Sequence, residues 1–165
     1  MNENFSVVKL SPEHRIPVID IFNYYIENSF AAFPENKMGY EFFDMIMKVS
    51  AGYPAAALLK DDGTVIGFGF LHAHNQMPAF KHTAEISYFI ADEYTGNGLG
   101  RLLLHYLLQG AEEKGIKVIL ASISSPNENS LKFHKNNHFK ECGRFVEVGF
   151  KKNTSFDVVW MERFI

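Results

Sequence analysis

The chain has 165 residues, 47% of them hydrophobic and 21% charged, which predicts one globular domain over residues 1–165. Its net charge of −3 and the lack of any run of Lys or Arg argue against a nucleic-acid partner. No apolar stretch is long enough to span a membrane and the N-terminus has no signal-peptide pattern, so we expect a cytoplasmic protein without a membrane partner. The single cysteine, Cys142, excludes an intramolecular disulfide and a cysteine metal cluster.

The first half of the chain predicts a strand, two helices and a hairpin. Ser11-Pro12-Glu13 is a helix-opening signal, and Pro17 indicates that regular helix begins near it, because proline fits only the first turn. A polar and aromatic loop separates the two helices, and the turn sequence Asp61-Asp62-Gly63 joins the strands of the hairpin. In chain order, the predicted elements cover residues 5–10, 11–27, 40–52, 54–60 and 64–74.

The second half predicts strands that alternate with helices, followed by two final strands. One helix begins at a glycine-rich loop and ends at Gly115, a residue type that is typical of helix C-termini. Because the hairpin in the first half interrupts any strict alternation of strand and helix, the fold class is mixed α/β. The strands are predicted over residues 83–91, 117–124, 139–150 and 155–165, and the helices over 98–115 and 126–138.

The segment YTGNGLGRLLL (94–104) places three glycines at alternate positions directly before a helix. A loop without side chains brings backbone N–H groups close to a ligand. The helix N-terminus adds further donors and a positive dipole end, and together these suit a phosphate. A dinucleotide-binding loop requires Gly-x-Gly-x-x-Gly after the first strand, and a P-loop requires Gly-Lys-Ser/Thr, but neither pattern is present. A glycine-rich turn that only caps the helix stays open as an alternative.

Four segments of the chain resemble the GNAT acetyltransferases, in particular the phosphinothricin and methionine sulfone/sulfoximine N-acetyltransferases. Residues 94–101 resemble the pyrophosphate loop of that superfamily, Gln/Arg-x-x-Gly-x-Gly/Ala, except that Thr95 stands at the Gln/Arg position. Residues 83–90 (TAEISYFI) are similar to the Thr-x-Glu strand of the group. Residues 127–134 (NENSLKFH) are similar to its Asn-x-x-Ser-x-x-Leu-His helix, and 148–161 to its C-terminal Val-Gly-x-Lys to Trp-Met stretch. The resemblance covers nearly the whole chain in order.

This resemblance implies the GNAT acyl-CoA N-acyltransferase fold, a central mixed, mostly antiparallel sheet of about seven strands flanked by about four helices. It also implies acetyl-CoA as acetyl donor and a homodimer to which residues 156–164 contribute. The fourth and fifth strands are expected to splay beyond Glu85, which frees backbone groups around Phe89 and Ile90 for the pantetheine arm. The implied cofactor-binding residues are Phe89, Ile90, Thr95, Gly96, Asn97, Gly98, Leu99, Gly100, Arg101, Asn127, Ser130 and His134.

Asn127, Ser130 and His134 are spaced three and four residues apart, so they share one face of the predicted helix. Asn127 follows Pro126 and is a natural helix N-cap. By residue type alone, the face would be a cap with a solvated polar surface. The resemblance instead places it against the cofactor, where His134 would stand near the thiol sulfur and could protonate the departing thiolate.

Glu85 lies in the middle of a predicted strand, where a carboxylate is costly unless it is paired or faces water. A structural interpretation is a salt bridge to Lys81 or to another cation. The functional interpretation, which the resemblance supports, is a general base. An aliphatic amine with a pKa of about 10.4 is mostly protonated at neutral pH and must lose a proton before it attacks a thioester. The predicted catalytic residues are therefore Glu85 and His134.

The acceptor is less well defined than the acetyl donor. The resemblance implies a small amino-acid-like amine, with Phe30 and Phe33 as an aromatic wall and Lys81 and His82 as cations for an acidic group, beside Glu85. The preceding loop lacks the Trp and Arg that the group often carries, so a polyamine or a peptide N-terminus stays open. A non-catalytic acyl-CoA sensor is a second class of function, which a base and a proton donor disfavour.

Two further observations concern histidines. His72, His74 and His82 invite a zinc hypothesis, but no fourth ligand stands at a familiar spacing, so we expect no metal. His138 replaces the Gly that usually precedes the Phe in the family. A non-glycine residue with positive φ at that helix C-terminus is expected to be strained.

Overall fold

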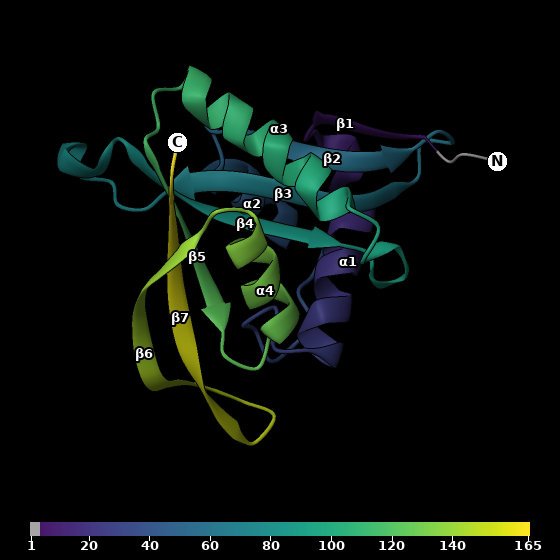
Figure 1. The fold of residues 1–165 in the computed structure, drawn as a ribbon. Helices are drawn as coiled ribbons and strands as arrows, with labels where there is room; N and C mark the ends of the chain where they lie inside the picture. The colour runs from purple at the N-terminus through teal and green to yellow at the C-terminus, as the bar shows by residue number, and fades with distance from the viewer. Residues whose placement is uncertain (1–3) are drawn as a thin grey trace.

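Seven strands form one sheet in the order β1-β2-β3-β4-β5-β7-β6, as Figure 1 shows. The computed structural model describes residues 4–165, so residues 1–3 of the predicted domain lie outside the described part. All neighbouring strands are antiparallel except β4 and β5, which confirms the predicted mixed, mostly antiparallel sheet. The strands are β1 Phe5–Lys9, β2 Ala55–Lys60, β3 Val65–Ala73, β4 Thr83–Ile90, β5 Val118–Ser124, β6 Lys140–Lys151 and β7 Thr154–Phe164.

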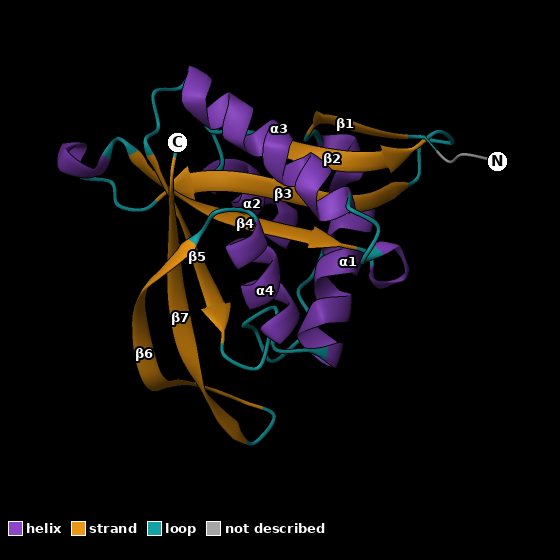
Figure 2. Ribbon diagram, viewed as in Figure 1, coloured by secondary structure: helices purple, strands orange, loops and turns teal. Residues whose placement is uncertain are grey.

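Four α-helices cover the two faces of this sheet (Figure 2). α3 packs on β2, β3 and β4 on one face, and α1 packs on β3 and β4 together with α2 on the other. The alternation of β2 explains the two cores, because Ala56 and Leu58 are buried on the α3 side and Ala57 on the α1 and α2 side. No helix within residues 4–165 is long and apolar enough to cross a membrane. The helices are α1 Arg15–Asn28, α2 Phe42–Val49, α3 Leu99–Glu113 and α4 Glu128–Asn136.

The parallel strands β4 and β5 stay paired for only three residues. Thr83, Ala84 and Glu85 of β4 pair with β5, after which β4 continues along β3 and β5 continues along β7. Figure 1 shows the two strands diverging from this point, with α4 beside the gap. The splay expected beyond Glu85 is therefore confirmed, and one edge of β4 from residue 86 to 90 has no strand partner among residues 4–165.

The ends of the helices follow the predicted signals. A single 3-10 turn over Pro12–His14 precedes α1, so regular helix begins two residues before Pro17. Asn127 caps α4, because its side-chain oxygen accepts a hydrogen bond from the Ser130 N–H at 3.2 Å. His138, just beyond α4, has a φ of 66°, which confirms the strained conformation expected of a residue in a glycine position.

Candidate active site

The divergence of β4 from β5 opens a cleft of about 1100 Å³. One part, which we call the α4 half, is lined by the loop from Thr95 to Gly100 and by α4. The other part, the α1/α2 half, is lined by α1, the loop that follows it, α2, β3 and the side of β4 that carries Glu85. The predicted site residues that line the cleft are Phe33, Glu85, Phe89, Ile90, Thr95, Gly96, Gly98, Gly100, Asn127, Ser130 and His134.

The glycine-rich loop has a backbone that only glycine adopts easily. Gly96 and Gly98 both have a φ of 79°, and a Cβ atom built on either meets nothing within 4 Å. Gly98 is the N-cap of α3, so the first N–H groups of this helix have no partner inside the helix. Open space in front of a helix N-terminus is what a pyrophosphate requires, so these residues fit the family's acetyl-CoA.

Other predicted cofactor residues are placed outside the cleft lining. Leu99 is buried in the core on the α3 side, and Asn97 and Arg101 are exposed. Thr95 lines the cleft, but its hydroxyl donates to the carbonyl oxygen of Asp92 at 2.8 Å. Thr95 therefore stabilises the loop's own conformation, in contrast to the long side chain that the family's Gln or Arg would extend.

The imidazole of His134 is buried and hydrogen-bonded at both nitrogens. Nδ1 lies 2.7 Å from the carbonyl oxygen of Ser130, and Nε2 lies 2.7 Å from the hydroxyl oxygen of Tyr88 on β4. A carbonyl oxygen only accepts, so Nδ1 carries the proton, and Nε2 of the neutral ring accepts from Tyr88. Burial lowers the pKa of His134 to about 4, although the hydrogen bond that Nδ1 donates to the carbonyl oxygen of Ser130 raises it.

This arrangement does not favour the proton-donor role expected of His134. At neutral pH the ring is uncharged and its one proton is directed at Ser130. Burial raises the pKa of Tyr88, so the phenol is also a weak acid. Tyr88 was not among the predicted site residues.

Glu85 is partly exposed, with 22% of its side chain accessible, and lines the cleft at the point where the strands part. Its Oε1 lies 2.7 Å from Nδ1 of His74, and its Oε2 lies 3.9 Å from Nε2 of His72, the residue opposite it on β3. Its partners among the described contacts are thus two imidazoles on the neighbouring chain segment, and the salt bridge to Lys81 is not formed. The carboxylate is held from one side and open to the cleft on the other.

The predicted acceptor cations, Lys81 and His82, do not line the cleft. Both are exposed and precede β4, and Nδ1 of His82 contacts the carbonyl oxygen of Gly115 beyond the end of α3. Both residues lie in the turn before Thr83, the first residue of β4, and so do not belong to the strand that carries Glu85. Phe33 lines the cleft, whereas Phe30 packs against Phe156 behind the loop.

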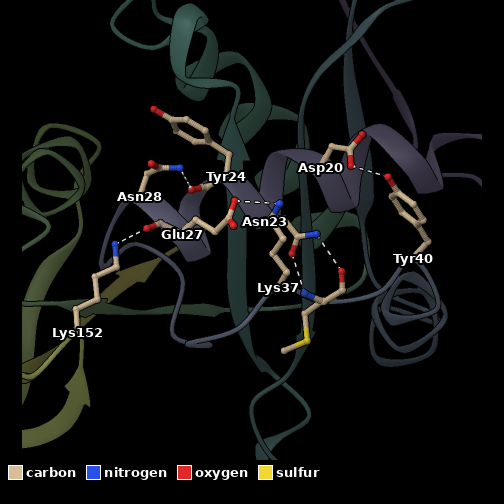
Figure 3. A network of polar contacts seen from close by, with 9 residues as sticks. Asp20, Asn23, Tyr24, Glu27, Asn28, Lys37, Tyr40 and Lys152 are labelled. Atoms are coloured by element: carbon tan, nitrogen blue, oxygen red, sulfur yellow. Dashed lines mark hydrogen bonds and ion pairs between the residues drawn. The ribbon is translucent and has the colours of Figure 1, made fainter.

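The loop between α1 and α2, residues 29–41, is attached to the rest of the molecule by polar contacts, and its residues 29–34 form a wall of the cleft. Figure 3 shows the α1 side, where Asn23 exchanges two hydrogen bonds with the Met38 backbone and Asp20 accepts from Tyr40. On the other side, fully buried Lys151 donates to the carbonyl oxygens of Ser29 at 2.9 Å and Ala32 at 2.7 Å. Lys151 belongs to the resembling C-terminal stretch, but the sequence alone gave no reason to connect it with this loop.

The histidines beside Glu85 do not form a metal centre. Within residues 4–165, no group of three or more His, Cys, Asp or Glu side chains is arranged to hold a metal ion. Nδ1 of His82 contacts the carbonyl oxygen of Gly115, beyond the end of α3, and not Glu85.

Known proteins match both the sequence and the fold. The model of the acetyltransferase (GNAT) family matches residues 18–139. An L-amino acid N-acyltransferase of Escherichia coli is 32% identical over 112 residues, 68% of this chain and 64% of that protein. An L-methionine sulfoximine/L-methionine sulfone acetyltransferase of Pseudomonas aeruginosa is 31% identical over 111 residues, 67% of this chain and 64% of that protein. The matches thus span somewhat less than two thirds of these two relatives.

The comparison of folds agrees with these sequence matches. A phosphinothricin acetyltransferase from Sinorhizobium meliloti, solved in complex with acetyl-CoA, superposes with a TM-score of 0.92 at 23% identity, over 98% of this chain and 88% of that one. The family match extends from α1 through the glycine-rich loop to the end of α4, and therefore includes both halves of the cleft. This chain belongs to the acetyltransferase (GNAT) family.

Proposed function

We propose that the protein transfers the acetyl group of acetyl-CoA to the nitrogen of a small primary amine. The observation that carries the proposal is the cleft between β4 and β5, which the glycine-rich loop and the carboxylate of Glu85 both line. Relatives named for L-amino acids and for methionine sulfoximine and sulfone support a small primary amine as the class of acceptor.

The α4 half would hold the cofactor. The backbone N–H groups at Gly98 and the first turn of α3 are oriented to bind the pyrophosphate, and Asn127 and Ser130 line the same half. The unpaired edge of β4 offers backbone groups to the pantetheine arm. The carbonyl oxygen of Ile90 already accepts from the hydroxyl of Tyr25 at 2.6 Å, so pantetheine would use other groups on this edge. Acetyl-CoA supplies the acetyl thioester.

Glu85 would be the general base. The ammonium group of the acceptor gives up one proton to the carboxylate, directly or through a water molecule, and the free nitrogen then attacks the thioester carbonyl carbon. His74 holds the carboxylate in place through the 2.7 Å contact. As the carbon–sulfur bond breaks, the nitrogen gives its second proton to water and the sulfur receives a proton from water in this scheme. His134 acts as a positioning residue that fixes Tyr88 and the wall of the α4 half.

A homodimer is part of the same proposal. β6 is the edge strand of the sheet, and Phe145, Val146, Val148 and Phe150 on it are between 59% and 71% exposed. On β7, Phe156 is buried and Phe164 is exposed, so β6 offers more apolar surface than the C-terminal strand. An exposed apolar edge strand favours pairing with a second copy. Light scattering at micromolar concentration should give twice 18.8 kDa, and a monomer would contradict this part.

A thiol-release assay with acetyl-CoA tests the proposed activity. The acceptor panel contains L-amino acids, methionine sulfone and sulfoximine, apolar amines, a polyamine and a short peptide. We expect release of free CoA that depends on one class of amine. Calorimetric binding of CoA without turnover on any acceptor would contradict the proposed activity and indicate a sensor of acyl-CoA instead.

A further inference from the structure

The α1/α2 half of the cleft is apolar and aromatic. Phe22 and Tyr25 come from α1, Phe42 and Met45 from α2, and Phe70 and Phe89 from the sheet. The rings contact one another, with centroids of Phe22 and Phe89 5.3 Å apart and those of Tyr25 and Phe89 5.4 Å apart. A groove of this composition favours an apolar ligand body and offers aromatic faces to a cation.

The charges of the cleft are distributed unequally between its halves. Within residues 4–165, the charged side chains that line the cleft are Glu85, Asp92 and Lys132. Lys132 lies on α4, in the half that would hold the cofactor, and Asp92 accepts from the hydroxyl of Tyr24 near the glycine-rich loop. Around Glu85, the α1/α2 half therefore presents a carboxylate and neither Lys nor Arg.

The nearby cations have other partners. Lys151 is fully buried behind the loop, where its ammonium group donates to the carbonyl oxygens of Ser29 and Ala32. His72 and His74 do not line the cleft, and both approach the carboxylate of Glu85. An anion in the α1/α2 half would therefore compete with the carbonyl oxygens for Lys151 and with Glu85 for the two imidazoles.

An α-amino acid carries its carboxylate on the same carbon as the amine. When that amine approaches Glu85, the two carboxylates come close together, and the ligand's carboxylate enters an apolar groove without a cationic partner. Both effects disfavour binding. An amine without this carboxylate brings only a positive charge, which Glu85 and the aromatic rings attract.

We propose that the acceptor is a primary amine on an apolar or aromatic body, with no carboxylate on the amine-bearing carbon. This inference rests on the proposed acetyl transfer and selects a substrate class within it. It differs from the amino acids for which the two relatives are named, because the selectivity comes from the charges of this chain's own cleft.

A matched set of acceptors tests the inference by thiol release at saturating acetyl-CoA. 2-Phenylethylamine, L-phenylalanine and L-phenylalaninamide share one aromatic body, and the amide replaces the carboxylate with a neutral group. Compared at equal concentrations of free amine, kcat/KM should be about 100-fold or more higher for 2-phenylethylamine than for phenylalanine, the cost of one unpaired charged group. Phenylalaninamide should fall close to 2-phenylethylamine.

A pair of variants examines the cause. Met45 lines the groove and is 48% exposed, so Met45→Arg adds a cation there and should raise the preference for phenylalanine over 2-phenylethylamine about tenfold. Met77 is 66% exposed in a loop outside the cleft, and Met77→Arg should leave the ratio unchanged. Equal effects of the two substitutions would contradict the proposed cause.

The outcomes separate this inference from the proposed function. If phenylalanine or methionine sulfone is acetylated at least as well as 2-phenylethylamine, the inference is overturned and the acetyl transfer stands. If no amine is acetylated although CoA binds, the proposed function fails, and the inference fails with it.

Discussion

The two halves of the cleft are built in different ways. The α4 half consists of two short continuous segments, residues 95–100 and α4, and it offers backbone N–H groups, glycines and small polar side chains. The α1/α2 half is assembled from four separate segments and consists mainly of large aromatic side chains around Glu85. The comparison suggests that one half fixes an invariant cofactor and the other half selects the acceptor. Substitutions in each half should therefore affect different steps.

The largest expected effect concerns Glu85. Glu85→Gln keeps the shape of the side chain but cannot accept the amine's proton, so the rate at pH 7 should fall by about 10²- to 10⁴-fold. The affinity for CoA should stay within about twofold, because this residue lies in the α1/α2 half. Steady-state kinetics and calorimetry measure the two quantities. Glu112→Gln, on the exposed face of α3, is the control and should change neither. A matching loss of CoA affinity in Glu85→Gln would remove the distinction between the halves.

The converse effect is expected at Gly98. A Val side chain at a φ of 79° strains the loop and projects into the open space in front of α3, so CoA affinity should fall about 10- to 100-fold. Gly63, in the turn between β2 and β3, has a φ of 84° and equally open surroundings. Gly63→Val should therefore cost similar stability but bind CoA normally in the same titration. Loss of binding in both variants would show that strain, and not access, is responsible.

A third effect concerns the burial of His134. Its pKa of about 4 lies below the ordinary 6.5, so the unfolded chain takes up a proton first as the pH falls. The native state should thus lose up to about 3 kcal/mol of stability between pH 6.5 and pH 4, and it should keep this contribution above pH 6.5. Denaturant unfolding at several pH values measures it, and His134→Gln should show a shallower dependence. Parallel curves for the two proteins would count against the buried neutral imidazole.

The smallest effect is expected at His138, just beyond the α4 half. His138→Gly removes the strain of a φ of 66° and should raise stability by about 0.5 to 1 kcal/mol, which corresponds to about 2 °C in Tm. The same substitution at exposed His105, inside α3, should lower stability by about 1 kcal/mol, because glycine disfavours helix. Calorimetric melting of both variants checks the opposite signs, and a lower Tm for His138→Gly would contradict the prediction.

The difference in construction between the α4 half and the α1/α2 half explains which features could be predicted from the sequence. The seven strands, the four helices and the lining glycines were predictable, because periodicity and turn residues act over short distances and the cofactor segments are continuous. The proximity of Lys81 and His82 to Glu85 in sequence was misleading, because both lie in a turn before β4 and neither lines the cleft. The contacts of Glu85 with His74, of His134 with Tyr88 and of Lys151 with the Ser29 carbonyl join distant segments, and no local pattern encodes them.

The pH dependence of kcat/KM in wild type and Glu85→Gln, with the best acceptor found in the amine panel, tests the central claim most directly. A general base takes the proton from the ammonium group. Loss of the base should therefore matter most at pH values where the amine is protonated. We predict that the ratio of the two rates is largest near pH 7 and narrows towards the pKa of the free amine, about 10.4 for an aliphatic amine. A ratio that stays constant across this range, together with a lowered melting temperature of the variant, would show that Glu85 holds the strand in place and is not the base.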